Sequence, residues 1–432
     1  MRFLRLCLEL GLLVFVPVAI FACYYLFADD AARRFYILDM QADYISGVIA
    51  AIVFLALTQA PLIPREHRII LSLLWIMRAG VTLGFSLFYE ARYRLDAVWY
   101  FNTGVFESGH WAYVNFGDGT YLMYALVGEL STISESYTYL KVCFSFVGLA
   151  AVYLFYLACR TALGREDMRI LLALGMFPSL MFWTSILGKD PVTSFGIAVF
   201  SLGVVGFIRS RRFDWLWLVA AGLLIASAVR LWLAPIFIAP LAMTALLTSR
   251  TSVTFRATTA AIGVPAFLWA AGLFAERFEI DTARDLVQTT DTLSRAWATG
   301  GSGQQIQSFD SLGAMVAFLP WGAFTALFRP LPGEVNNIFG VLAGVENALL
   351  LGLVLFGLCR FGVRKTLRDP VVLWAVLTLL AWAAIYGFVS SQNLGTAFRF
   401  RAQVTPILLP LALYLAFAEF RRPAIAARRA PA

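Results

Sequence analysis

The sequence predicts an all-α, polytopic integral membrane protein with about 12 transmembrane helices. Of the 432 residues, 60% are hydrophobic and 14% are charged, whereas a soluble domain carries about a quarter charged residues. Apolar runs of about 18 residues or more recur along the chain, and each can cross a bilayer as a helix. Because isolated strands would leave backbone groups unpaired in lipid, runs of this length favour helices.

The predicted spans follow one another along the whole chain, separated by polar or basic segments. They cover residues 6–27, 45–63, 69–88, 142–159, 170–186, 192–208, 215–229, 233–247, 257–274, 338–358, 371–389 and 406–417. The first apolar run resembles a signal peptide but is too long for one, so we interpret it as an uncleaved span. Residues 1–432 are therefore treated as a single transmembrane domain.

Basic residues predict the orientation of these spans. Twelve spans place both termini on one side, and the loops there carry the larger share of lysine and arginine, as cytoplasmic loops do. Five polar segments then share the outer face: residues 89–141, the turn at Lys189, Arg230, residues 275–337 and the loop at Arg399. Because arginines in short loops account for much of the net charge of +8, that charge does not indicate nucleic-acid binding.

The first large outer loop, residues 89–141, is the predicted centre of the chemistry. It is too polar to span a membrane, yet it is rich in aromatic residues, glycine and carboxylates. Outside the cytoplasm, activated donors are usually lipid-linked phosphates. Transfer from such a donor needs a carboxylate that takes a proton from the acceptor hydroxyl. It also needs cations that stabilise the departing phosphate and a groove for a long isoprenoid tail.

Asp96 is the predicted general base, although a surface ion pair with a neighbouring arginine would also explain its charge. Lys189, Arg230, Arg399 and Arg401 lie at predicted outer span ends and are the predicted donor-phosphate clamp. Each has a structural alternative as well. Lys189 could simply begin a helix that has proline in its first turn, and Arg230 could snorkel towards the interface.

Four further residues are secondary candidates. Asp118 lies in a Gly-Asp-Gly turn signature, Glu107 could cap an interfacial helix, and His110 fits an aromatic interface belt. Arg78 lies inside a predicted span, where a charge is expensive and is usually functional or paired. Glu346 is one candidate partner for Arg78.

The second large outer loop, residues 275–337, is predicted to be interfacial or re-entrant. Its apolar segment Leu312–Phe328 contains Pro320 near the middle, so we expect two short helices there. The glycine-rich stretch at residues 300–303 is predicted to be a flexible hinge that is ordered only with substrate.

Cysteine usage argues against a disulfide framework or a zinc site. The five cysteines lie in or at the edges of apolar runs, and no CxxC pair is present. Paired or metal-binding cysteines would instead recur at short, characteristic spacings.

A resemblance to a known class rests on three stretches: RLDAVWY (residues 94–100), FPSLMFWTSILGKDP (177–191) and GTAFRFRAQVTPILLPL (395–411). They resemble, in order, the acidic element of a first large extracytoplasmic loop, a span-to-loop element ending in a cation and an acid, and a late arginine-aromatic segment. The class is that of the GT-C polyprenyl-phosphate-dependent glycosyltransferases, in particular bacterial members related to protein mannosyltransferases and aminoarabinose transferases.

The resemblance implies a GT-C-like fold with extracytoplasmic interfacial helices. The implied reaction transfers a sugar from a polyprenyl-phosphate donor to a glycan, lipid or protein acceptor. It would take place at the outer face of the bacterial inner (cytoplasmic) membrane, in the biosynthesis of cell-envelope polysaccharide or glycoconjugates. Direct displacement assisted by one carboxylate would invert the anomeric centre.

The chain departs from the class pattern in three ways. Two spans precede the first large loop where the class usually has one, and no soluble C-terminal domain follows the last span. The acidic element contains Asp96 alone rather than a pair of acids. We therefore predict no metal ligands, name no cofactor and leave metal dependence open.

Two other functions are compatible with the sequence. A polysaccharide polymerase or ligase using an undecaprenyl-diphosphate-linked oligosaccharide would also have many spans and arginine-bearing outer loops. A transporter or flippase for lipid-linked sugars is the weaker alternative. Transporters often show internal repeats and polar residues at mid-membrane, whereas here the polar residues concentrate outside the predicted spans.

Overall fold

The computed structural model describes residues 2–93, 95–248, 253–298, 302–305, 307–361, 367–417 and 419. Over these residues the regular structure is helical, and strand-like pairing is limited to two isolated β-bridges. Within these described ranges, seven helices are long and apolar enough to cross a membrane. The predicted all-helical membrane protein is confirmed at this level.

These seven helices of the described residues correspond to some of the 12 spans predicted from the sequence. They are Val14–Phe35, Met40–Leu57, Arg65–Arg92, Tyr137–Leu163, Lys189–Ser210, Ile338–Arg360 and Pro370–Ser390. Four shorter apolar helices are Trp215–Val229, Leu233–Leu247, Leu312–Phe328 and Thr405–Ala416. The count of 12 spans stays a prediction.

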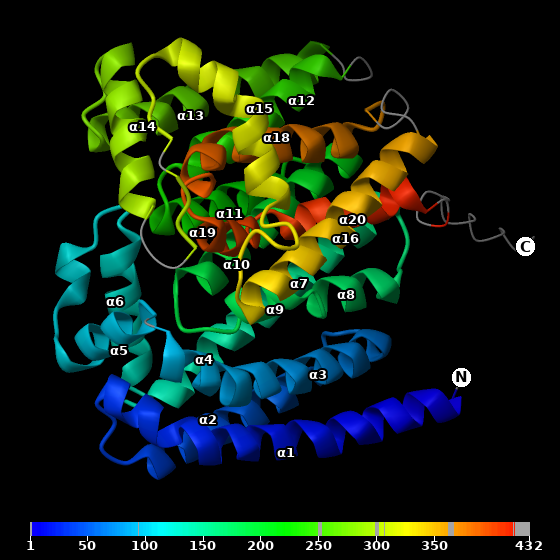
Figure 1. Ribbon diagram of the computed structural model, residues 1–432. Coiled ribbons are helices and arrows are strands. Elements are labelled where there is room, and N and C mark those ends of the chain that lie inside the picture. The colour runs from blue at the N-terminus through cyan, green and yellow to red at the C-terminus, as the bar shows by residue number, and fades with distance from the viewer. Residues whose placement is uncertain are drawn as a thin grey trace, which may run out of the picture. The chain divides into compact units, whose positions relative to one another are not determined.

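The described chain packs as two compact units, and the first comprises Met1–Leu157, Asp167–Val199 and Leu224–Arg230. Its helices are α1 (Arg2–Phe35), α2 (Met40–Leu57), α3 (Arg65–Ala79), the π-helix η1 (Gly80–Phe85), α4 (Ser86–Arg92), α5 (Ala97–Phe106), the 3₁₀-helix η2 (His110–Tyr113), α6 (Gly119–Ser131), most of α7 (Tyr137–Leu163), α8 (Met168–Gly175), α9 (Pro178–Trp183), the start of α10 (Lys189–Ser210) and the end of α11 (Trp215–Val229). Figure 1 shows α1 and α3 of this unit side by side.

The predicted span 170–186 is wrong as a single helix, because this segment forms the short helices α8 and α9. Pro178 begins α9, and Phe177 before it is extended, with φ −67° and ψ 117°. A residue that precedes proline is restricted to extended conformations by the pyrrolidine ring. The apolar run therefore breaks at Met176–Phe177, and Lys189 follows α9 after a short turn.

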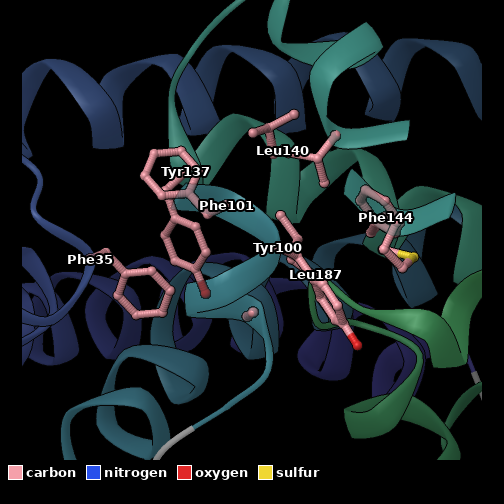
Figure 2. Close-up of a cluster of buried hydrophobic side chains, with 10 residues drawn as sticks. Phe35, Tyr100, Phe101, Tyr137, Leu140, Phe144 and Leu187 are labelled. Carbon is pink, nitrogen blue, oxygen red and sulfur yellow. The ribbon is translucent and has the colours of Figure 1, made fainter. Parts of the chain in front are cut away.

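The core of the first unit joins the first large loop to the segment that precedes Lys189. Figure 2 shows this cluster, in which the aromatic rings of Phe35, Phe101 and Tyr137 gather. The Phe35 and Tyr137 rings stack with centroids 3.9 Å apart. Tyr100 of α5 and Leu187 belong to the same buried cluster. Packing in this core therefore fixes α5 relative to the turn at Lys189.

The second unit comprises Ala158–Glu166, Phe200–Leu223 and Leu231–Ala432. Besides the remaining parts of α7, α10 and α11, its helices are α12 (Leu233–Leu247), α13 (Val253–Arg277), α14 (Ala283–Trp297), α15 (Leu312–Phe328), α16 (Ile338–Phe361), α18 (Pro370–Ser390), α19 (Leu394–Arg401) and α20 (Thr405–Ala416). Within this unit α16 and α20 lie side by side (Figure 1).

The prediction of two short helices at Leu312–Phe328 is wrong, because α15 is one continuous helix with Pro320 inside it. Its packing explains this. A Cβ on Gly387 of α18 would lie 2.6 Å from the carbonyl carbon of Gly322 on α15. Small residues let two apolar helices approach closely. Such a neighbouring helix supports α15 although Pro320 cannot donate a backbone hydrogen bond.

The predicted glycine-rich hinge is only partly covered by the structure. Gly300 and Gly301 lie outside the described residues. Ser302 Oγ donates to Asn393 Oδ1 at 2.8 Å, and Gly303 forms an isolated bridge with the same residue. The amide of Leu394 also donates to the Ser302 carbonyl at 3.1 Å. Ser302 and Gly303 thus contact the start of α19, and the ordering of the stretch by substrate stays a prediction.

Candidate functional site

Lys189 is the first residue of α10 and lies among residues of the first large loop. Its Nζ donates to Thr120 Oγ1 at 2.8 Å and lies 5.9 Å from the centroid of the Tyr100 ring. A cation near an aromatic ring face is attracted by the ring quadrupole. Since the side chain is only half-buried, its ammonium group occupies a partly open site.

Arg230 lies beside the same site, directly after α11. Its guanidinium pairs with the carboxylate of Asp190 at 3.2 Å, and both side chains are buried. Arg230 also forms an isolated antiparallel bridge with Asp118, whose carboxylate accepts from the Thr120 amide at 3.1 Å and so caps α6. Asp118, Asp190 and Arg230 therefore bring together three segments that are far apart in sequence, all within the first unit.

A glycine makes this junction possible. A Cβ on Gly119 would lie 2.3 Å from the carbonyl oxygen of Val229, which is closer than real Cβ contacts come. Any other residue would separate the start of α6 from the end of α11. The sequence pattern around Asp118 indicates the turn, but it does not reveal this close approach.

Asp96 lies at the start of α5, where its side chain is exposed and forms no helix-capping hydrogen bond. Tyr100 follows four residues later, and residues spaced by four lie on the same helix face. Asp96 therefore lies on the α5 face that carries Tyr100, the ring near the Lys189 ammonium. The predicted base and one predicted phosphate-binding cation thus belong to one compact unit.

Arg78 is fully buried and binds the turn that leads to Lys189. It donates to the Thr184 carbonyl at 3.1 Å, to Thr184 Oγ1 at 2.8 Å and to Ser185 Oγ at 3.0 Å. Gly148 permits this packing, because a Cβ there would lie 2.0 Å from the Thr184 carbonyl oxygen. These acceptors, rather than the suggested Glu346, are the hydrogen-bond partners found for Arg78.

Sequence reasoning missed a buried ionic cluster at the base of the first large loop. Lys141 Nζ lies 3.0 Å from one oxygen of Glu90, and Tyr137 donates to the other at 2.6 Å. Glu90 lies near the end of α4 and Lys141 lies near the start of α7, so the pair joins the two ends of the loop. Charges 51 residues apart carry no signal in a single sequence that would pair them.

His110 and Glu107 have structural roles at the end of α5. His110 is buried, and its Nε2 lies 3.0 Å from the carbonyl oxygen of Thr103 and 3.1 Å from that of Glu107. Only a protonated Nε2 can donate to these acceptors, and the contacts satisfy carbonyls at a helix end. Glu107 is the exposed C-cap residue of this helix.

The two late arginines lie on α19 in the second unit. Arg401 is fully buried and donates to the carbonyls of Leu327 and Arg329, at 3.1 and 3.3 Å, and to Asn347 Oδ1. Burial lowers the pKa of Arg401 to about 10. Arg399 is half-buried. The Arg401 bonds support the packing of this unit, and donor-phosphate binding by either arginine stays a prediction.

An open apolar groove of about 990 Å³ lies in the first unit. Its walls come from α2, α6, α7 and α10, with Ile49, Leu126, Phe146, Val192 and Phe195 among the lining residues. Val192 is three residues after the first residue of α10, so this wall of the groove begins one helical turn from the candidate site.

The described residues contain no group of three or more His, Cys, Asp and Glu side chains that could hold a metal ion. Comparison of the chain with models of protein families, with curated proteins and with solved structures finds no match.

Proposed function

We propose that this protein is a membrane glycosyltransferase that moves a sugar from a polyprenyl-phosphate donor to an acceptor hydroxyl at the outer face of the inner membrane. One observation carries the proposal. The Lys189 ammonium lies beside Thr120 and Tyr100, and Val192, three residues after Lys189 on α10, lines an open apolar groove. A cation on a helix that also lines an apolar groove suits a phosphate attached to a long hydrocarbon tail.

The groove supports the lipid part of this donor. Its lining is almost entirely aliphatic and aromatic, so an isoprenoid chain could lie there without removing polar groups from their hydrogen-bond partners. Ile49 and Val53 on its wall are more than half exposed, so the groove opens at the surface of the unit. A donor could therefore enter it sideways from surrounding lipid.

Lys189 supplies the positive charge that the departing phosphate needs. The charge of Arg230 is largely balanced by Asp190 at 3.2 Å, so Arg230 acts mainly by holding the junction together. As the bond between the anomeric carbon and the phosphate oxygen breaks, negative charge grows on the phosphate. A fixed ammonium group stabilises that state more than the ground state.

Asp96 is the proposed general base. It takes the proton of the acceptor hydroxyl as the acceptor oxygen forms its bond to the anomeric carbon. The polyprenyl phosphate leaves with the electron pair of the broken bond. The acceptor attacks opposite the leaving group in a single displacement, without a covalent sugar–protein intermediate. The anomeric configuration therefore inverts. Asp96 is exposed at the start of α5, where an acceptor could reach it.

The test measures transfer and donor binding separately on purified protein in lipid nanodiscs. Asp96→Asn should lower turnover with polyprenyl-phosphate-linked hexoses by about 10²–10⁴-fold and leave the affinity for undecaprenyl phosphate nearly unchanged. Lys189→Ala should weaken undecaprenyl phosphate binding by about tenfold or more, because it removes a charge-assisted contact.

Arg212→Ala is the matched control, since this exposed arginine pairs with Asp214 outside the candidate site. It should leave binding and turnover unchanged. Turnover of Asp96→Asn within a few-fold of wild type would exclude Asp96 as the base and make Asp118 and Glu107 the next candidates. A ladder of products of increasing length would indicate the polymerase instead of a single-sugar transferase.

A further inference from the structure

Four tyrosines form a continuous row that leads from the surface of the first unit to Lys189. Ring centroids are 6.2 Å apart between Tyr113 and Tyr121, 5.8 Å between Tyr121 and Tyr124, and 6.1 Å between Tyr124 and Tyr100. Exposure falls along the row, from 61% at Tyr113 and 41% at Tyr121 to 4% at Tyr100. The inner ring is the one beside the Lys189 ammonium.

The row is built on elements that hold the rings in place. Tyr121 and Tyr124 lie on α6, whose start is fixed by the Asp118 cap, and Tyr113 ends η2. His110 packs against Tyr124 with centroids 5.7 Å apart. The outer rings therefore do not need a ligand to be arranged, and a ligand that stacks on them would lose little binding energy to ordering the site.

Two acidic residues lie next to the row: Asp118 caps α6 three residues before Tyr121, and His110, which packs on Tyr124, also contacts the carbonyl of Glu107. Burial is the main reason that the pKa of Tyr124 is raised, and the charges of Glu107 and Asp118 raise it further. The hydroxyl of Tyr124 therefore stays protonated and can donate or accept hydrogen bonds. Carboxylates near aromatic faces accept hydrogen bonds from hydroxyl groups, whereas they repel anionic lipid headgroups.

This combination selects among possible occupants of the row. An apolar helix or lipid tail packed on it would bury tyrosine hydroxyls and carboxylates without partners, which is costly. A pyranose ring presents C–H groups on its faces and hydroxyls at its edge. It therefore matches aromatic faces that are bordered by hydroxyls and carboxylates.

We propose that Tyr113, Tyr121 and Tyr124 form the acceptor site and that the acceptor is a pyranose glycan rather than a peptide or a simple lipid. The inference rests on the proposed glycosyltransferase function and names its acceptor class. The sugar units stack along the row, and the terminal hydroxyl lies at its inner end near Tyr100. Asp96 shares a helix face with that ring.

The test uses an array of immobilised glycans containing hexoses, N-acetylhexosamines, 6-deoxyhexoses and uronic acids, probed with the purified, labelled full-length protein. Wild type should bind at least one glycan family. Tyr121→Ala should weaken that binding on the order of tenfold, because it removes one stacking ring, and Tyr121→Phe should keep most of it. Phe106→Ala is the control, since Phe106 is an exposed aromatic whose ring contact is with Phe101 outside the row.

The outcomes separate this inference from the proposed function. Binding of no glycan, or equal loss in Tyr121→Ala and Phe106→Ala, would overturn the acceptor site. Undecaprenyl phosphate binding that depends on Lys189 would then still support the proposed function. Capture of a peptide by the tyrosine row would also overturn the inference. If folded wild-type protein binds neither undecaprenyl phosphate nor any glycan, both proposals are refuted.

Discussion

Glu90→Gln should destabilise the protein strongly, because it breaks a buried ion pair. Lys141 Nζ lies 3.0 and 3.3 Å from the two Glu90 oxygens, and both side chains are 1% exposed. Tyr137 donates to the same carboxylate at 2.6 Å. The substitution keeps the volume of the side chain and an acceptor for Tyr137. It removes the carboxylate charge that pairs with the Lys141 ammonium.

The expected loss follows from that geometry. Removing one partner of a buried pair leaves an uncompensated buried charge and costs about 3–5 kcal/mol. Replacing both partners, as in Glu90→Gln with Lys141→Met, removes the buried charge altogether. The double variant should therefore be more stable than Glu90→Gln alone, since well-packed neutral side chains often substitute for a buried pair without loss.

The assay is reversible unfolding of the purified protein in detergent micelles with added denaturant. Circular dichroism monitors the loss of helix. Glu166→Gln is the control, because its pair with Arg160 is 2.9 Å long but the two side chains are 48% and 38% exposed. Such surface pairs contribute about 0–1 kcal/mol. A loss for Glu90→Gln no larger than that of the control, or strictly additive effects in the double variant, would refute the reasoning.

Three further predictions concern the junction, the second loop and the late arginines. Gly119→Ala should lower stability by about 1–3 kcal/mol and weaken undecaprenyl phosphate binding, because its Cβ would lie 2.3 Å from the Val229 carbonyl oxygen; the same unfolding and binding assays check both effects. Hydrogen bonds lower the pKa of Asp285 below its ordinary value of 3.8, so its stabilisation of α14 is fully present above that value and is lost as pH falls through the folded-state pKa; amide exchange in α14 should show this acid dependence in wild type and not in Asp285→Asn. Arg401→Leu should reduce the unfolding midpoint more than Arg399→Leu, since Arg401 is fully buried with three protein acceptors and Arg399 is half-buried; equal midpoints would contradict this.

The helical breaks show where local sequence reasoning succeeds and fails. The apolar runs predict helices correctly because chain length and side-chain polarity decide whether a segment can lie in lipid. Proline has opposite outcomes at two positions. Pro178 begins a new helix after an extended residue, whereas Pro320 lies within a continuous helix. The difference arises from packing, since α15 is held against α18 through Gly322 and Gly387.

The candidate site shows the same division. The sequence by itself determines that this is a helical membrane protein, and it identifies Asp96, Lys189 and Arg230 as polar residues next to apolar runs, because these are properties of short segments. Only the tertiary structure decides that Lys189 contacts Thr120 and that the tyrosine row ends at Lys189. It alone also decides that Arg230 pairs with the carboxylate of Asp190. Such contacts depend on close approach between segments about 40 to 110 residues apart, and that approach is set by core packing and by glycines where two backbones meet.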